Sequence, residues 1–258
     1  MRMGAKIAVI VPAFNEQALI VRTLSSLPEW VDAICVVDDA SRDETRERVL
    51  GVADPRIQLL THPWNIGVGG AIATGYRAAL AAQADILVVM AGDNQMDPSD
   101  LAGIVQPILE GRADYVKGNR FEHAAFREMP LLRRVGGRYL SALTRLATGL
   151  RVGDTQCGYT ALTAKTLERL PLDQLWPSFG YPNDLLAMLA AAGSRVIEVP
   201  VRPVYADEES GMRPWHVLTI TRVIGAAWLK RSFHRNVHMR TFVVDPIETR
   251  GDSQARES

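Results

Sequence analysis

KIAVIVPAFNE, residues 6–16, is the most informative segment for the fold class of this chain. Its first half is an unbroken apolar run rich in β-branched residues, and the run ends at Pro12. Such a run predicts a strand buried on both faces, as in a parallel sheet covered by helices. Apolar residues within 16–27 then recur at helical spacing, so we expect a helix to follow the strand.

The same alternation continues over about the first 120 residues. Further apolar runs at 33–39, 56–60, 85–90 and 114–121 predict strands. Helices are predicted after Ser41, where Glu44 completes a capping-box pattern, over 68–83, and from Ser99 or Asp100. Alternating strands and helices predict βαβ units, hence an α/β fold with a Rossmann-like, mostly parallel sheet and helices on both faces.

Polar residues follow each of these predicted strands. In open parallel sheets, ligands bind outside the carboxyl ends of the strands, so we expect these residues to share one ligand site. The clusters are Asn15–Glu16, Asp38–Asp39, Asn65–Gly67, Asp93–Gln95 and Lys117–Arg120.

The pattern is looser in the second half of the chain. Residues 126–150 are predicted to be helical and carry several arginines, and DTQCGYTAL, residues 154–162, predicts a turn leading into a strand. A helix is expected over 181–193 and a last strand over 194–205, before a polar tail.

Composition excludes several classes of protein. The formal net charge of the 258 residues is zero, which gives no electrostatic case for nucleic acid as a partner. Two cysteines do not form a disulfide framework. The N-terminus lacks the features of a signal peptide, and no apolar run reaches the ~18 residues of a membrane span. We therefore expect a cytoplasmic location.

The segments VIVPAFNE, VVDDASRDET, NIGVGGAIATGY, GDNQMDP, GNRF and DTQCGYTAL follow one another in this order. In that order they resemble the family 2 glycosyltransferases, and most of all those that act on dolichyl or polyprenyl phosphate. The resemblance runs from Ile7 to Gly211. It implies a GT-A fold with an acceptor-side extension, forming one domain over 1–245. The nucleotide-binding half would cover about 1–120, the acceptor half about 121–213, a C-terminal amphipathic helix about 214–235, and a polar tail 246–258.

The resemblance implies an inverting transfer of a hexose from a GDP- or UDP-linked sugar. Glu16 would then bind ribose hydroxyls, and Asp39 the base or the ribose. Each residue also has a structural alternative. Glu16 could instead be an acid that stabilises the first turn of a helix, and Asp38 and Asp39 could shape a turn or cap a helix. The donor-binding residues expected are Pro12, Ala13, Asn15, Glu16, Asp38, Asp39, Asn65, Gly67 and Asn94.

A metal site is expected in VVMAGDNQMDP, residues 88–98. Related transferases have a D-x-D-x-Q loop there, and Asp93 and Gln95 match its second acid and its glutamine, while Ala91 replaces the first acid. Carboxylate and amide oxygens suit Mg²⁺ or Mn²⁺, which would stabilise the departing diphosphate. With one acid missing, we expect the metal to arrive with the donor. Asp97 is expected to shape the turn.

Further residues, from Lys117 onward, are matched to the site. Lys117 and Arg120 would contact phosphate, Asp154 and Gln156 would lie near the sugar, and Arg202 and Arg213 would belong to a segment closing over the diphosphate. Asp184 is the candidate general base, although an ionised phosphate acceptor would need none.

Pro214–Arg235 could lie on an anionic membrane at its inner face, or it could pack on the domain or on a partner in a homo-oligomer. The leading acceptor is a polyprenyl phosphate. A soluble hydroxyl compound is the first alternative, and a non-catalytic sugar-nucleotide-binding scaffold, suggested by Ala91, is the second.

Overall fold

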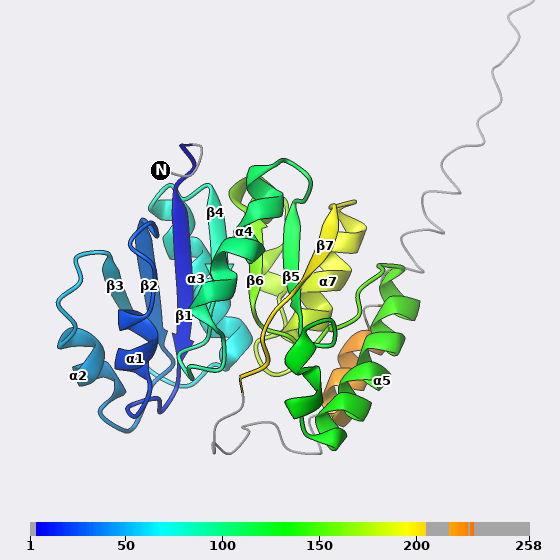
Figure 1. Ribbon diagram of the computed structural model, residues 1–258, viewed down its shortest axis with the longest axis horizontal. Coiled ribbons are helices and arrows are strands. Elements are labelled where there is room, and N and C mark those ends of the chain that lie inside the picture. The colour runs from blue at the N-terminus through cyan, green and yellow to red at the C-terminus, as the bar shows by residue number, and fades with distance from the viewer. Residues whose placement is uncertain (1–3, 205–216, 227, 230–258) are drawn as a thin grey trace, which may run out of the picture.

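The computed structural model describes residues 4–204, 217–226 and 228–229. Its centre is a seven-stranded sheet in the order β3-β2-β1-β4-β6-β5-β7 (Figure 1). The strands are β1 Ile7–Ala13, β2 Ala33–Asp38, β3 Ile57–Thr61, β4 Ile86–Val89, β5 Tyr115–Asn119, β6 Thr160–Thr163 and β7 Val196–Pro200. The α-helices are α1 Ile20–Ser25, α2 Thr45–Leu50, α3 Val68–Ala81, α4 Leu101–Leu109, α5 Leu131–Thr148, α6 Ala164–Leu167 and α7 Tyr181–Ala191. Three short 3₁₀ helices are η1 Pro98–Asp100, η2 Ala124–Glu128 and η3 Leu172–Gln174.

The sheet is mostly parallel, as predicted. β1 pairs in parallel with β2 and β4, β2 with β3, and β5 with β7. β6 alone among these strands runs antiparallel, and it lies between β4 and β5. The sheet is therefore continuous through both predicted halves, and β4 and β5 still end at the same edge.

The apolar run that begins the sequence forms the middle of the core. Every residue of β1 is buried. Ile7, Val9 and Val11 face the side covered by α1, α2 and α4, whereas Ala8 and Ile10 face the side covered by α3 and α7. A strand buried on both faces has no polar side, which explains why its sequence shows no alternation.

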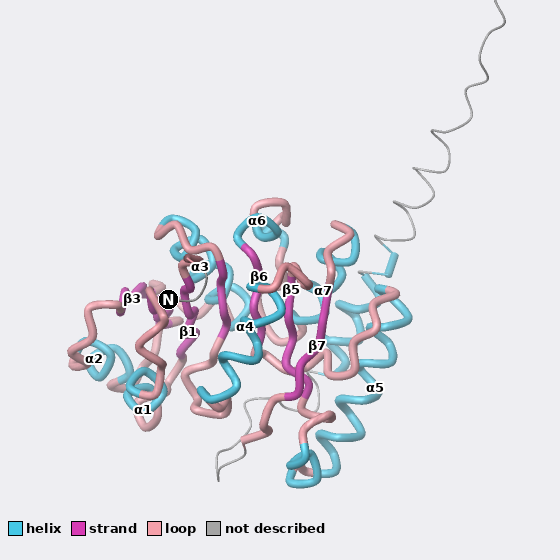
Figure 2. Tube along the Cα trace, turned by 45° about the horizontal axis from the view of Figure 1, so that its top comes forward, coloured by secondary structure: helices cyan, strands magenta, loops and turns pink. Residues whose placement is uncertain are grey.

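Two helices lie beyond β7. Figures 1 and 2 both place α5 at that end of the sheet. α5 contacts α7, and the helical residues 217–226 pack against α5 through Ile220, Ile224, Leu140 and Ala147. Among the helices of the described part, none has both the length and the apolar character needed to cross a bilayer.

The expected capping box after the second strand was wrong. α2 begins at Thr45, and the Glu44 side chain makes no capping hydrogen bond. The Ser41 and Thr45 hydroxyls instead accept backbone N–H groups of the loop after β1, from Asn15 at 2.9 Å and Glu16 at 2.7 Å. The first helix also begins at Ile20, later than expected, because residues 14–19 form this loop.

Candidate active site

The carboxyl ends of the parallel strands meet at one edge of the sheet, the lower edge in Figure 1. At this edge the buried Pro12 and Ala13 end β1 and form its wall. Asn15 adopts a positive φ of 58°, an αL conformation that asparagine tolerates. Its side-chain oxygen accepts the backbone N–H of Arg42 at 2.8 Å. The loops after β1 and β2 are therefore joined by direct hydrogen bonds.

The two aspartates after β2 have different environments. The Asp39 carboxylate accepts the N–H groups of Ile66 at 3.0 Å and Gly67 at 2.8 Å, and it lies 2.7 Å from the Nδ1 atom of His62. These contacts engage both of its oxygens inside the protein. Asp38 accepts one backbone N–H, from Ser41, at 3.2 Å. Asp39 thus orders the loop before α3, and Asp38 is the aspartate with more hydrogen-bonding capacity for a ligand.

The loop at the start of α3 packs closely against the segment before α7. A Cβ on Gly67 would lie 2.5 Å from the Pro177 carbonyl oxygen, and one on Gly69 would lie 2.2 Å from that of Trp176. The Asn65 amide donates to the Asp39 carbonyl at 3.2 Å. The start of α3 is therefore packed against residues 176–177 at Gly67 and Gly69, whereas Asn65 holds the residue after β2.

The candidate metal loop continues from β4. The Asp93 Oδ1 atom accepts the Gln95 backbone N–H at 3.1 Å, and Asn94 has a positive φ of 53°. Met96 pairs with Pro203 in an isolated β-bridge and lies next to Gly158. The loop is therefore fixed to the end of β7 and to the turn before β6.

The same loop lies close to the start of α7. Burial raises the pKa of the Tyr181 hydroxyl, and the charge of Asp93 adds to this rise. Gly158 lies between Met96 and the Tyr181 hydroxyl. Asp93 therefore lies near the first turn of α7.

The donor set fits a hard divalent cation. Asp93 can supply one carboxylate and Gln95 one amide oxygen, ligand types that Mg²⁺ and Mn²⁺ accept. The described residues contain no cluster of three or more His, Cys, Asp or Glu side chains suited to a metal. Two protein ligands leave most of the coordination sphere to diphosphate oxygens and water.

Arg120 forms a close ion pair with Asp154. Its Nε and Nη2 atoms donate to the two carboxylate oxygens at 2.7 and 3.0 Å. Burial disfavours the Asp154 carboxylate, but the Arg120 charge outweighs this effect and keeps the Asp154 pKa below its ordinary value. Glu198 also accepts the Asp154 backbone N–H, at 2.9 Å. The pair thus joins the end of β5 to the turn before β6.

Lys117 does not follow β5, as expected, but lies within it. Its side chain is fully buried and donates to the Cys157 carbonyl. Burial lowers the pKa of the ammonium group. The expected strand-end position of Lys117 was wrong, because its ammonium group is held inside the protein by the Cys157 carbonyl.

The amide side chains of Gln156 and Asn183 connect the turn before β6 to α7. The Gln156 Nε2 group donates to the Asn183 Oδ1 atom at 3.0 Å, and the Thr144 hydroxyl donates to the same oxygen at 2.8 Å. In the described part of the chain the Asn183 Nδ2 group has no hydrogen-bond partner, although it is buried. Asp184 follows at the first turn of α7 and accepts the Trp176 backbone N–H at 2.8 Å.

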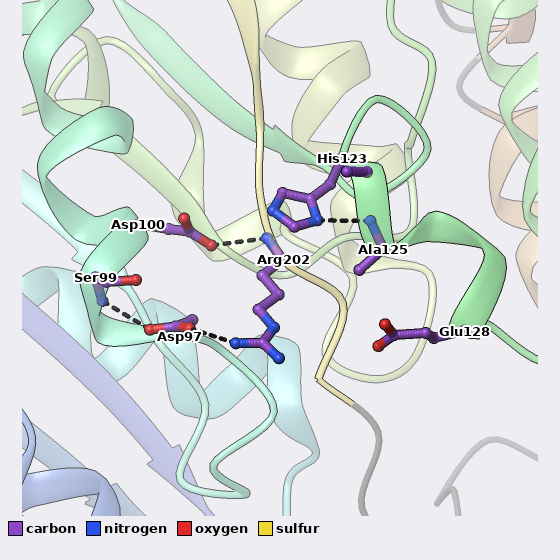
Figure 3. A pocket seen from close by; sticks show the side chains of 8 residues that line it. Asp97, Ser99, Asp100, His123, Ala125, Glu128 and Arg202 are labelled. Carbon is purple, nitrogen blue, oxygen red and sulfur yellow. Dashed lines mark hydrogen bonds and ion pairs between the residues drawn. The ribbon is translucent and has the colours of Figure 1, made fainter.

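The segment after β7 borders a cavity of about 560 Å³ (Figure 3). The Arg202 backbone N–H donates to Asp100 at 2.7 Å, and its guanidinium lies 3.9 Å from Asp97. Asp97 caps η1, as a turn-shaping residue, through the Ser99 backbone N–H. That bond, together with the Arg202 charge, lowers the Asp97 pKa. Figure 3 shows His123 and Glu128 on the opposite wall. Arg213 lies outside the described residues.

Sequence reasoning missed three contributors to the site. His62, directly after β3, contacts Asp39, and Trp176 contacts Asp184. Glu198 accepts the N–H groups of the 153–154 turn. The position of His62 at a strand end was a usable signal, whereas the other two contacts join segments distant in sequence.

This sheet with its polar carboxyl edge is the nucleotide-binding architecture of the GT-A glycosyltransferases, as the comparison with solved structures confirms. Over 89% of its length this chain has a structure similar to that of glucosyl-3-phosphoglycerate synthase of Mycobacterium tuberculosis in complex with phosphoglyceric acid. The similarity covers 81% of that chain, with a TM-score of 0.67 and 25% identity. The same enzyme with Mn²⁺, UDP and glucosyl-3-phosphoglycerate gives a TM-score of 0.63 at 25% identity, over 89% and 81% of the two chains.

The chain belongs to glycosyl transferase family 2, whose sequence model matches residues 8–161. It is 30% identical over 217 residues to UDP-N-acetylglucosamine–dolichyl-phosphate N-acetylglucosaminyltransferase of Methanococcus voltae, over 78% of this chain and 86% of that protein. It is also 30% identical over 212 residues to undecaprenyl-phosphate mannosyltransferase of Micrococcus luteus, over 80% and 86% of the two chains. The expected family and enzyme class are therefore confirmed.

Proposed function

We propose that this enzyme transfers a hexose, with inversion and with the help of a divalent metal, from a nucleotide diphosphate sugar to a polyprenyl phosphate. The observation that carries the proposal is the grouping of the Asp93 loop, the Arg120–Asp154 pair and the first turn of α7 at one sheet edge. The names of the two relatives, which act on dolichyl and undecaprenyl phosphate, support the choice of acceptor.

The donor would bind across the ends of β1 and β2. Pro12 and Ala13 supply a buried backbone wall, and Glu16 lies at the rim of the loop that follows. Asp38 has acceptor capacity for a base N–H or a ribose hydroxyl. Asp39 supports the donor indirectly, since its carboxylate holds the loop of Asn65 and Gly67.

Asp93 and Gln95 would hold Mg²⁺ or Mn²⁺ beside Asn94, together with the donor diphosphate. The bound metal would neutralise charge that builds up on the departing diphosphate. Arg120, held by Asp154, and Arg202, at the end of β7, are the described cations that would face phosphate. Arg213 is proposed for the same role from the sequence alone.

Asp184 would orient the acceptor and the sugar. A polyprenyl phosphate is already ionised at neutral pH, so its oxygen can attack without a strong base. One Asp184 oxygen accepts the Trp176 N–H, which fixes the direction of the carboxylate. Gln156 lies beside it through the contact with Asn183 and would approach the donor sugar.

A soluble hydroxyl acceptor is the second candidate. The cavity beside Arg202 favours it, because its walls carry Asp97, Asp100 and Glu128, and carboxylates repel a phosphate but accept hydrogen bonds from hydroxyl groups. The structural neighbour in complex with phosphoglyceric acid also has a small soluble ligand, but the acidic walls in this chain would suit an uncharged hydroxyl compound better than such an anion. With such an acceptor, Asp184 would serve as the general base. Membership of an enzyme family favours either candidate over a scaffold.

We place the enzyme in the cytoplasm, at the inner face of the membrane. For residues 214–235, contact with the membrane and packing on the domain or a partner were both expected as alternatives. Ile220, Val223 and Ile224 are buried, whereas Leu218 and Trp228 are exposed. Residues 214–216, 227 and 230–235 lie outside the described part.

The function is tested in two stages. Thermal-shift measurements with GDP- and UDP-linked hexoses, with and without Mn²⁺ or Mg²⁺, identify the donor, because a ligand that binds the folded state raises its stability. Labelled donor is then offered with undecaprenyl phosphate or with an uncharged polyol such as glycerol. Labelled lipid supports the proposal, and labelled water-soluble product alone supports the second candidate. Donor binding without product from any acceptor would contradict both.

A further inference from the structure

The outer face of α5 carries an unusual set of exposed apolar side chains. Leu131, Leu132, Val135, Tyr139 and Leu146 are all exposed, with Leu132 at 80% and Leu146 at 77%. Residues 132, 135, 139 and 146 follow helical spacing, so they share one side of the helix. Five of the fourteen exposed large hydrophobic residues in the described part therefore belong to this one helix.

The opposite side of α5 is already packed. Leu140, Thr144 and Ala147 are buried, and the contacts of α5 are with α7 and residues 217–226. An amphipathic helix of a globular protein normally buries its most apolar side. α5 buries a small-residue side and leaves large apolar residues in solvent, which indicates a surface for an external partner.

The positive charge of α5 indicates what kind of partner its exposed face would bind. The helix contains Arg133, Arg134, Arg138 and Arg145, and no acidic residue lies anywhere in 131–153. Two copies packed through this face would bring like charges together, which opposes self-association. An anionic bilayer surface satisfies both features, because lipid head groups neutralise arginines while the acyl boundary accepts the apolar side chains.

We infer that α5 docks on an anionic lipid surface through the face formed by Leu131, Leu132, Val135, Tyr139 and Leu146. Docking there would bring the reaction site close to the lipid, since Thr144 on α5 bonds to Asn183, the residue before Asp184. Figure 1 shows that α5 begins near the edge where the parallel strands end. Arg138 and Arg145 also line a cavity of about 330 Å³, together with Asn119, Ser141 and the acidic Glu122.

The inference is tested by vesicle flotation with the full chain. Vesicles of phosphatidylcholine alone are compared with vesicles containing about 30% phosphatidylglycerol, and neither contains polyprenyl phosphate or donor. We expect binding to the anionic vesicles to be at least about 10-fold stronger, and to weaken as salt is raised. The double substitution Leu132→Gln and Leu146→Gln should reduce it at least about 10-fold.

A matched control is Leu50→Gln. Leu50 is 67% exposed on α2, at the other end of the sheet, and its loss should leave vesicle binding unchanged. Equal binding by the control and the double variant, or no vesicle binding by the wild-type chain, would overturn the inference. A dimer in light scattering that the double variant converts to a monomer would assign the face to a second copy instead. Because no sugar transfer is measured, this inference can fail while the proposed function holds, and the reverse.

Discussion

The Trp176 backbone N–H donates a hydrogen bond to the Asp184 Oδ2 atom over 2.8 Å, so the acceptor-side carboxylate is held from outside its own helix. Trp176 is itself placed by α3, because its carbonyl lies where a side chain on Gly69 would be. The direction of the Asp184 carboxylate therefore depends on the close packing of Trp176 against the start of α3.

Asp184→Asn separates the two roles of this carboxylate. The asparagine oxygen can still accept the Trp176 N–H, but the side chain can no longer take a proton. We expect less than about 10-fold loss of turnover with polyprenyl phosphate, whose oxygen is already ionised. A hydroxyl acceptor should suffer at least about 100-fold loss, the usual contribution of a general base. Steady-state rates with each acceptor measure the difference, and a large loss with the phosphate acceptor would identify Asp184 as a base there too.

Gly69→Ala tests the contact between the two halves. Its Cβ would lie 2.2 Å from the Trp176 backbone oxygen, so the segment must move, and we expect a loss of about 1–3 kcal/mol in the free energy of unfolding. Gly103→Ala, near the start of α4, has no atom within 4 Å of the new Cβ and should stabilise the protein by about 0.5–1 kcal/mol. Urea unfolding of both variants checks this, and equal effects would refute the steric account.

Arg120→Met leaves the Asp154 carboxylate buried without its ion-pair partner. We expect a loss of about 3–5 kcal/mol in the free energy of unfolding at pH 7. In the wild type the folded-state Asp154 pKa is lowered, so its stabilisation is present above its ordinary value near 3.8 and lost below it. In the variant the Lys117 charge remains but the contributions of Arg120 to lowering this pKa are lost, so we expect the pKa to rise and protonation on acidification to relieve the penalty. The difference between wild type and variant should therefore shrink from pH 7 to pH 4.

Arg195→Met is the matched control for this ion pair. Arg195 also binds a carboxylate with two donors, Asp114 at 3.1 and 2.8 Å, but its side chain is 57% exposed. Solvent screens such a pair, so the loss should be much smaller and nearly independent of pH over the same range. Denaturant titrations at pH 7, 5.5 and 4 measure both variants. Identical losses would show that burial of Asp154 does not determine the effect.

The sheet and its ligand-binding edge could be predicted because strands buried on both faces leave uninterrupted apolar runs. The contacts within the edge could not. Lys117 is a charged residue of the kind expected at the end of a strand, but it is buried. The charges of Asp154 and Glu198, which are far away in sequence, favour its ammonium form there. Asp39 was expected to touch the donor, yet its oxygens hold His62 and the backbone of Ile66 and Gly67. Local sequence identifies such side chains, but tertiary packing determines what they bind.

The candidate metal loop shows the same limit. Asp93 and Gln95 were identified from the resemblance to the D-x-D-x-Q loop of related transferases, and the structure places their loop near α7 and the segment after β7. Ala91, where related loops have an acid, predicts weak affinity for free metal. Metal affinity should therefore rise when a nucleoside diphosphate is present, because its oxygens complete the coordination sphere.

The most direct test of the central claim is a metal titration of lipid-linked product formation. Wild type and Asp93→Asn are incubated with donor, undecaprenyl phosphate and increasing Mn²⁺ or Mg²⁺, and the sugar–lipid product is measured by mass spectrometry. We predict product only in the presence of metal for the wild type, and at least about 100-fold less for Asp93→Asn at unchanged melting temperature. Full activity of Asp93→Asn, or of the wild type in excess chelator, would contradict the account.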